Sequence, residues 1–291
     1  MSAIKKILIL IFIISLAGFM ACETNNSNTN GEKVLGPYDY EAPFAQTAPV
    51  IDGRGNDPVW ERARWMPIDQ VWLGGGNASS SNLTPPPEGT FSGRFKIVWT
   101  EERLYFLVEI LDTYLSLTRI SDPYNDMYQD DCLELFIDES GLGRNHLANN
   151  TAFAYHLSYD GVSVADYVSP LPNVSTPIPG TADIARNGYI LRNNHLRFAI
   201  GNRNNENRSN VYTWEVEMKV FDENHPVRHN PPNYPPVRLY EGKTMGFAVA
   251  YCNAGPSNQR EYFMGSVFIP GANKNRAYMN ANVFAKLHLV K

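Results

Sequence analysis

The alternation of apolar and polar positions between residues 129 and 138 predicts a β-strand at the centre of the fold. Two sets of side chains alternate there, with Leu133, Leu135 and Ile137 in one set and Cys132, Glu134 and Phe136 in the other. Successive side chains of a strand point to opposite faces, so the first set should face a core. A single carboxylate between a thiol and a phenyl ring favours a shallow binding face on the other side. We expect Glu134 to hydrogen-bond a ligand and Tyr128 to offer a stacking ring; the alternative is that both residues only complete the surface and the packing.

The same alternation predicts further short strands along the chain, at residues 95–99, 104–110, 153–159, 189–191, 196–200, 212–220, 246–252 and 283–289. The connections are rich in Gly, Pro, Ser and Asn, notably at residues 74–93, 170–180 and 226–236. Trp60 and Trp65 follow a tight Asp52-Gly53 turn and are expected to anchor the core. No stretch has the pattern of a long amphipathic helix. The chain is therefore expected to be an all-β protein, a β-sandwich.

The first residues have the pattern of an export signal. Lys5 and Lys6 precede the apolar run 7–16, and Ala21 stands directly before Cys22. This order is typical of a secretory signal peptide, and a cysteine after a small residue resembles a bacterial lipobox, in which Cys22 would be lipidated. The alternative is a plain signal peptide with an incidental cysteine. We predict a signal peptide at 1–21, a flexible tether at 22–44 and a folded domain at 45–291, exported and lipid-anchored in the bacterial cell envelope, at the outer membrane or in the periplasm.

Charge and motifs exclude several classes of function. The net charge is −5 and no basic cluster occurs, so nucleic acid is not an expected partner. The spacings HExxH, GxSxG and the phosphate-binding loop are absent from the sequence. We therefore expect no catalytic activity.

Four motifs in order carry a resemblance to a known family. They are 49–53, 57–60, the pair 98–99 and 104–106 ending at Asp112, and 131–138. The succession resembles the family 9 carbohydrate-binding modules over residues 45–291. The resemblance implies a β-sandwich of jelly-roll type that binds sugars and can hold structural calcium.

The resemblance also implies a sugar-binding site, composed of Tyr128, Glu134, His156, Ser158 and Tyr278. Tyr128 and Tyr278 stand where studied members have sugar-clasping tryptophans, and Glu134 matches the central glutamate. His156 replaces a ligand-binding arginine, and Ala250 replaces a glutamine. Two aromatic rings with donors and acceptors between them suit a sugar, which offers C–H groups on its face and hydroxyls at its rim. The differences leave the chain-end specificity of the family open.

The sequence leaves two questions open: whether the protein binds a metal ion, and whether two of its cysteines form a disulfide. A structural calcium ion could take oxygens from an acidic set, Asp122, Asp126, Asp130, Asp138 and Glu139, which could equally be a solvated acidic loop. No other cofactor is expected. Cys132 and Cys252 lie on strands that the family topology brings near one another, and an oxidising compartment permits a disulfide between them. Two free thiols are the alternative.

The sequence thus predicts non-catalytic glycan binding by an exported, lipid-anchored protein. Its partners would be oligo- or polysaccharides, the membrane through the N-terminal lipid, and separate glycoside hydrolases or sugar importers. One alternative is a haem-binding electron-transfer protein of a related sandwich fold, with axial ligands among Met127, His156 and Met279. Another is an accessory part of a glycoside hydrolase system.

Overall fold

The computed structural model describes residues 35–118, 126–146, 150–166, 183–185, 188–190, 195–202, 210–226 and 233–291. The chain divides into two units, a first that ends at Val34 and lies outside the described residues, and a second that spans Leu35–Lys291. The predicted signal peptide and Cys22 lie outside the described residues. Within the described part, no helix has the length and apolar character needed to cross a membrane.

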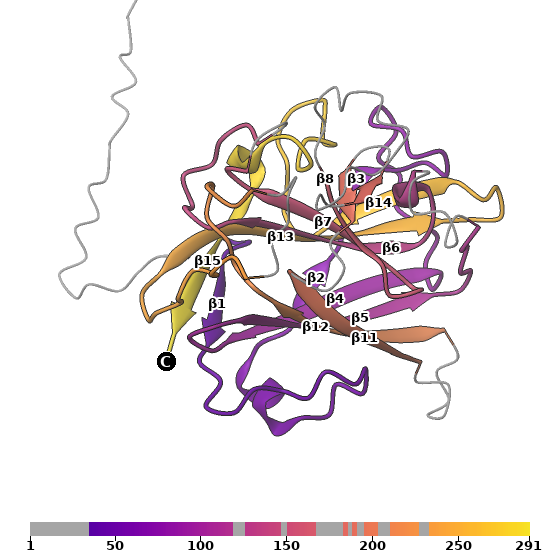
Figure 1. The fold of residues 1–291 in the computed structure, drawn as a ribbon. Helices are drawn as coiled ribbons and strands as arrows, with labels where there is room; N and C mark the ends of the chain where they lie inside the picture. Colours follow the sequence, from indigo (N-terminus) through magenta and orange to yellow (C-terminus); the bar gives the residue numbers. More distant parts are fainter. Residues whose placement is uncertain are drawn as a thin grey trace, which may run out of the picture. The chain divides into compact units, whose positions relative to one another are not determined.

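Two β-sheets form a sandwich in the second unit, which confirms the predicted fold class (Figure 1). The larger sheet runs in the order β1 (Tyr40–Pro43), β15 (Ala285–Val290), β13 (Thr244–Ala254), β6 (Cys132–Asp138), β7 (Phe153–Ser158), β8 (Ser163–Asp166), β10 (Gly188–Ile190) and β9 (Asp183–Ala185). Beyond this path, β14 (Arg260–Gly265) pairs with β13 and with β3 (Gln70–Leu73). The smaller sheet has the order β11 (Leu196–Asn202), β12 (Val211–Met218), β5 (Leu104–Asp112), β4 (Phe91–Trp99) and β2 (Met66–Ile68). The described residues also contain three short 3-10 helices: η1 (Pro58–Arg62), η2 (Met127–Gln129) and η3 (Ala281–Val283).

The predicted central strand, β6, is buried along its whole length. Leu133, Leu135 and Ile137 belong to the main hydrophobic core, as their alternation predicts. The opposite face is not open at its far end, because the Phe136 ring contacts Trp72 and Phe284 at centroid distances of 6.0 and 5.7 Å. Central strands of a large sheet are buried on both faces when other segments cover the outer one. The expected shallow face is therefore largely covered.

The folded unit begins earlier than the sequence predicts. Strand β1 lies inside the segment 22–44 that was expected to be a flexible tether, and it pairs in parallel with β15. Tyr40 is fully buried, and its hydroxyl donates to the Arg64 carbonyl oxygen at 2.7 Å and accepts from the Ile97 N–H at 3.1 Å. If residues up to 44 were a flexible tether, the Arg64 carbonyl oxygen and the Ile97 N–H would lose the Tyr40 hydroxyl as their partner. The boundary moves to Leu35.

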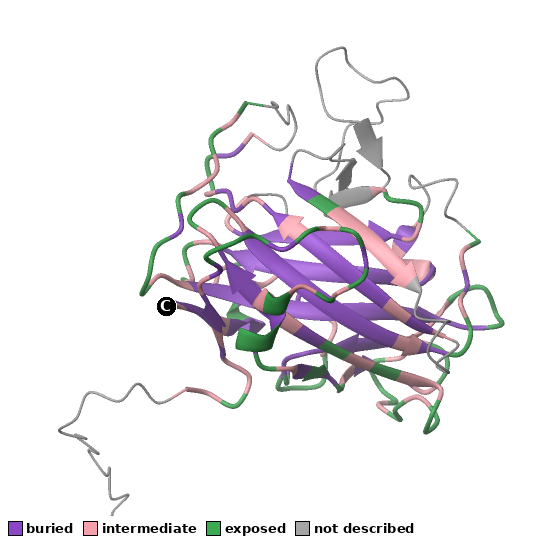
Figure 2. Cartoon of the chain, turned by 90° about the horizontal axis from the view of Figure 1, so that it is seen from below, coloured by how far each residue is buried: buried purple, intermediate pink, exposed green. Residues whose placement is uncertain are grey.

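A second hydrophobic cluster covers the outer face of the smaller sheet. The segment from Ala45 to Ala63 packs there against Val98, Tyr105 and Leu107. Trp60 is buried, which confirms it as a core anchor, whereas Trp65 is half-buried under the Arg94 guanidinium at 4.1 Å. In Figure 2 the strands β5 and β12 of this sheet are mostly buried, whereas the first half of β4 and most of the edge strand β11 are intermediate or exposed.

Glu215 on β12 is a charged residue of the outer face of the smaller sheet that other segments cover. It does alternate with Trp214 and Val216, but it is completely buried. Its Oε2 accepts from the Asp52 and Gly53 N–H groups at 3.2 and 2.8 Å, and its Oε1 accepts from the Trp60 indole at 3.1 Å. Gly53 has a positive φ of 81°, which favours glycine at the turn. The Asp52-Gly53 and Trp60 motifs are thus tied to one buried carboxylate.

Candidate functional site

The candidate site lies where β7, β6 and β13 run side by side in the larger sheet. The register places Cys132 opposite Cys252 on one side and opposite Ser158 on the other. It also places Glu134 opposite His156. Residues directly opposite on paired strands share a face, so these side chains gather on the face away from the core, as their parity predicts.

The side chains of this face form one connected polar cluster. The Glu134 carboxylate oxygen Oε1 lies 2.8 Å from His156 Nε2 and accepts from the Cys252 thiol at 2.9 Å. The Arg260 guanidinium donates to Cys252 Sγ at 3.4 Å. Glu134 is 2% exposed and His156 is 7% exposed, so the cluster lies inside the fold. Both cysteines are buried free thiols.

Burial and neighbouring charges shift the pKa values in opposite directions. Burial acts to raise the pKa of Glu134, but the charges of His156 and Arg260 and the hydrogen bonds outweigh it, so this pKa is lowered. Burial raises the pKa of the Cys132 thiol well above its ordinary value, and the neighbouring Cys252 adds to the effect. The cluster therefore holds the Glu134 carboxylate beside a neutral Cys132 thiol.

The sequence matches a known family of carbohydrate-binding domains. The sequence profile described as "Carbohydrate family 9 binding domain-like" matches residues 51–291. The chain belongs to this family. Domains of family 9 are binding modules, and the family supports carbohydrate binding as the general function.

Solved structures of family 9 modules share the fold. A module from Caldicellulosiruptor kristjanssonii in complex with cellotriose is 18% identical, with a TM-score of 0.56, covering 87% of this chain and 93% of that chain. A module from the same organism in complex with glucose is 19% identical, with a TM-score of 0.55, covering 86% of this chain and 95% of that chain. No curated protein matches the sequence.

The structure does not bring all residues of the predicted family 9 site together. Glu134 and His156 are bonded to each other inside the fold. The Ser158 hydroxyl is held by Asp160 and by the Val162 carbonyl oxygen. These three were expected to meet sugar directly, and their role in binding stays a prediction.

The two predicted aromatic platforms lie in different surroundings. Tyr128 is half-buried in η2, and the Arg260 guanidinium lies 5.0 Å from its ring centroid, so Arg260 covers one face of that ring. Tyr278 is half-buried in the segment between β14 and β15, next to Ala277, whose carbonyl oxygen is 2.9 Å from His146 Nε2. No ring contact joins the two tyrosines in the described part of the chain. Their role as a sugar clasp also stays a prediction.

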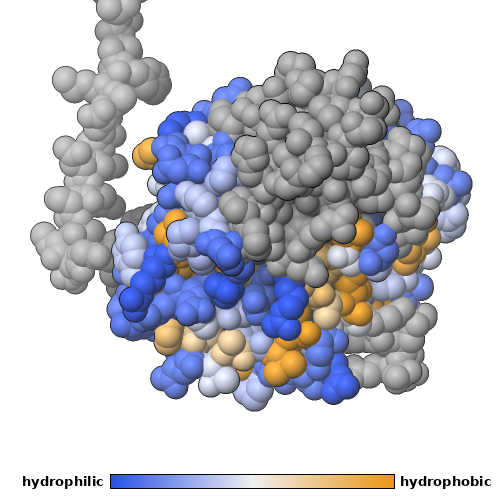
Figure 3. Space-filling view, in the orientation of Figure 1, coloured by the Kyte–Doolittle hydropathy of each residue, from blue (hydrophilic) through white to orange (hydrophobic). Residues whose placement is uncertain are grey.

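Arg260 is the residue of this region that the sequence does not predict. It follows a Gly-Pro-Ser-Asn turn and opens β14, and its guanidinium also lies over the Phe263 ring at 4.7 Å. It joins the buried cluster to Tyr128 through its contacts with Cys252 and the tyrosine ring. On the face of the described surface that Figure 3 shows, most of the strongly hydrophobic groups gather in one band at the lower right, and the rest of the face is mainly hydrophilic.

The haem-binding alternative would use His156, which is part of the same buried cluster. His156 is bonded to Glu134, and Met127 is buried against the main core. A haem at this face would have to separate His156 from Glu134, so visible absorption of the purified protein is the direct test of this alternative.

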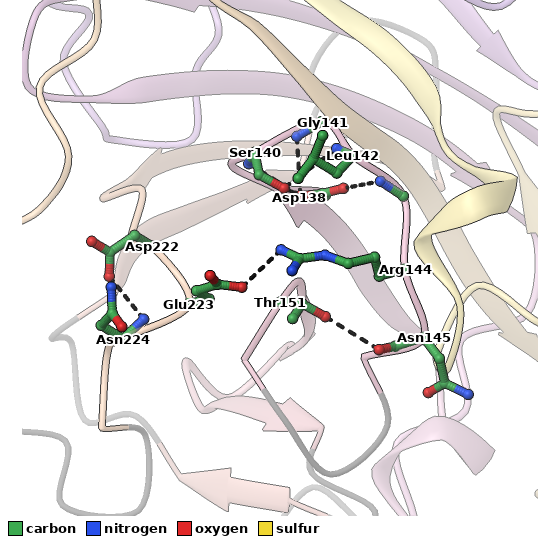
Figure 4. Close-up of polar contacts among 11 residues, drawn as sticks. Asp138, Ser140, Gly141, Leu142, Arg144, Asn145, Thr151, Asp222, Glu223 and Asn224 are labelled. Carbon is green, nitrogen blue, oxygen red and sulfur yellow. Dashed lines mark hydrogen bonds and ion pairs between the residues drawn. The ribbon is translucent and has the colours of Figure 1, made fainter.

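Two of the acidic residues considered for calcium, Asp138 and Glu139, have polar partners within the protein. Asp138 accepts from the N–H groups of Ser140, Gly141 and Gly143 at 3.1, 3.1 and 2.8 Å (Figure 4). Glu139 pairs with Lys243. The two oxygens of Asp138 thus fix the turn after β6, as an Asx-type turn does. Asp122 lies outside the described residues, and calcium binding stays a prediction.

Two buried carboxyl groups lie near the start of β6 and the end of β5. Asp131 accepts from the Ser116 and Ala254 N–H groups at 2.6 and 2.9 Å, and Asp112 accepts from the Asn253 amide at 3.1 Å. Burial raises the pKa of Asp112 to about 6. Burial together with the charge of Asp112 raises the pKa of Asp131 to about 10. Like charges in one buried site cannot both ionise easily, so the pair keeps a proton at neutral pH.

This pair predicts a fold that becomes less stable as the pH rises. Between about pH 4 and pH 10, Asp131 keeps a proton in the folded protein that it releases in the unfolded chain. The free energy of unfolding is therefore highest below about pH 4 with respect to this group, and it falls as the pH rises towards about 10. We expect Asp112→Asn to reduce this decline, because it removes the charge that repels Asp131. Melting temperatures from pH 5 to pH 9 measure the slope, with Glu88→Gln in an exposed loop as the control. An Asp112→Asn slope equal to that of the parent protein would contradict the shared proton.

Proposed function

We propose that this protein is a non-catalytic carbohydrate-binding protein that is exported and anchored by lipid, and that it captures glycans for separate hydrolases or importers. The observation that carries the proposal is membership of the family 9 binding domains over residues 51–291. Glu134, His156 and Ser158 are held by bonds inside the fold, so we assign the direct sugar contacts to Tyr128 and Tyr278. The two half-buried rings each offer an apolar face to a sugar ring.

The choice of test ligand follows from the similar structures. Modules of this fold have been solved in complex with cellotriose and with glucose, so cello-oligosaccharides are the first ligands to titrate. Calorimetry should give a dissociation constant between about 1 μM and 1 mM, or about 4–8 kcal/mol of binding free energy. A glycan array extends the test to other sugars. A folded protein that binds no glycan on the array and no cello-oligosaccharide would overturn the proposal.

The lipid anchor gives a separate prediction for Cys22. An apolar signal core and a small residue precede this cysteine, so it would become the lipidated first residue of the mature protein. We expect Cys22→Ser to release the protein from the membrane or to stop its processing. Cell fractionation and mass spectrometry of the mature N-terminus measure both outcomes. Unchanged membrane retention of the variant would count against lipidation.

A further inference from the structure

Four different metal-ligating side chains converge in the buried cluster of the larger sheet. One donor atom from each of Cys132, Glu134, His156 and Cys252 lies within 4.8 Å of the other three. All four residues are buried. Thiolate, imidazole and carboxylate are the ligand types that zinc takes in proteins, most often four at a time in a tetrahedral site.

The strand register explains why these four residues meet. Cys132 and Glu134 are two positions apart on β6, so they point to the same face. Cys252 stands opposite Cys132 on β13, and His156 stands opposite Glu134 on β7. Three neighbouring strands therefore deliver the donors from fixed backbone positions. A site built on strands is held more precisely than one built on loops.

The separations suit a single small cation. Zinc bonds of about 2.0–2.3 Å place tetrahedral donor atoms roughly 3–4 Å apart. The Glu134 Oε1 atom already has His156 Nε2 at 2.8 Å and Cys252 Sγ at 2.9 Å as neighbours. Those two contacts are bridged by protons, which a bound cation would replace, since a coordinating thiol is deprotonated outright. Small side-chain rotations would open the donors around the ion.

The charge of the surroundings fits a loaded site. A divalent cation held by two thiolates, one carboxylate and a neutral imidazole carries a single net negative charge. The Arg260 guanidinium, 3.4 Å from Cys252 Sγ, would neutralise that charge. Groups of this kind next to the ligands tune the affinity of metal sites. A fully buried charge without such compensation would be costly.

We propose that Cys132, Glu134, His156 and Cys252 bind one zinc-like divalent cation in a closed structural site. Both cysteines are 0% exposed, which leaves no open position for a substrate and disfavours a nucleophilic thiol at this place. Four protein ligands with no open position are the mark of structural zinc. Such an ion would clamp β7, β6 and β13 together and would hold Arg260 against Tyr128.

A disulfide between Cys132 and Cys252 is the direct competitor of this site. The two residues are opposite each other in the register, so the predicted disulfide and the metal site use the same sulfur atoms and exclude one another. The structure has both thiols free. Alkylation without reductant, followed by mass measurement, separates the two states in the purified protein.

The first experiment uses the purified, reduced protein, stripped of metal with a chelator. We expect it to take up one equivalent of Zn²⁺, measured by elemental analysis, with a rise in melting temperature as binding stabilises the folded state. We also expect Co²⁺ to bind and to give thiolate-to-cobalt charge-transfer absorption. The measurement requires no sugar, so its failure would leave the proposed function untouched.

Variants then assign the ligands. Cys132→Ser, Cys252→Ser, His156→Gln and Glu134→Gln should each lower the affinity for Zn²⁺ by more than about 10-fold, and Arg260→Gln should lower it by about 10-fold. The matched control is His225→Phe, which removes a buried histidine from a different cluster, around Phe221 and Tyr234. It should keep the full equivalent of metal.

Two results would overturn the site. One is a folded, reduced parent protein that takes up neither Zn²⁺ nor Co²⁺ at micromolar concentrations. The other is a disulfide between Cys132 and Cys252 in the protein purified from its own cell envelope. If a ligand variant fails to fold, the titration of the parent protein still decides.

Discussion

Replacing Glu215 by alanine is expected to destabilise the fold more than any other single truncation of a charged side chain described above. The carboxylate accepts three hydrogen bonds in a completely buried position, from the N–H groups of Asp52 and Gly53 and from the Trp60 indole. Alanine would leave three donors without an acceptor, and each orphaned buried donor costs about 1–3 kcal/mol. We expect a loss of about 3 kcal/mol or more in the free energy of unfolding. That corresponds to a fall of about 6–12 °C in melting temperature for a domain of this size.

The control for this prediction lies two residues along the same strand. Glu217 is 24% exposed in its side chain and pairs with Arg197 at 2.9 Å and Arg103 at 3.6 Å. Exposed ion pairs contribute little, so Glu217→Ala should cost less than about 1 kcal/mol. Thermal and urea unfolding of the two variants measure the difference. Equal stability of the two variants would show that Glu215 does not hold the segment 45–63 on the sheet.

The difference between Glu215 and Glu217 also shows what the alternation of side chains can predict. Alternation identifies the face of a strand, and both glutamates do share the outer face of β12. It does not reveal whether a distant segment covers that face. Glu215 is covered by residues more than 150 positions earlier in the chain, and only the packing of the motif around Trp60 makes it a buried acceptor. An outward polar residue can therefore be part of the interior.

At the candidate site, too, the alternation of side chains predicts which face a residue is on but not which residues it contacts. The parity of β6 and β7 predicts that Glu134 and His156 share a face, and the register confirms it. Their direct contact depends on pairing partners that one sequence does not specify. Strand β14 escapes sequence prediction because Arg-Glu-Tyr-Phe-Met-Gly lacks a clear apolar alternation, and with it the position of Arg260 escapes too. The resemblance to family 9 predicts the fold well, but the buried cluster is a property of this chain's own residues.

The second large effect concerns sugar binding by Tyr128 and Tyr278. We expect Tyr128→Ala and Tyr278→Ala each to weaken binding of the titrated glycan by about 30-fold or more, which corresponds to about 2 kcal/mol for an aromatic hot spot. Each ring would supply apolar contact and its face to the sugar. Both residues are half-buried against the main core, so truncation should lower the melting temperature only slightly. Calorimetry and thermal unfolding of the same samples measure the two effects.

Matched variants distinguish contact from packing. Tyr128→Phe and Tyr278→Phe keep the ring and should retain most of the affinity, whereas Tyr240→Ala removes a tyrosine that is 61% exposed in the turn before β13 and should bind as the parent does. If the two tyrosines only pack, their alanine variants will unfold at distinctly lower temperatures and still bind with the parent affinity. A large loss of affinity in one alanine variant, with parent affinity in the other, would assign a single platform. Arg260 already lies over one face of the Tyr128 ring, so a loss confined to Tyr278→Ala is the outcome that would place the stacked sugar at Tyr278, three residues before η3.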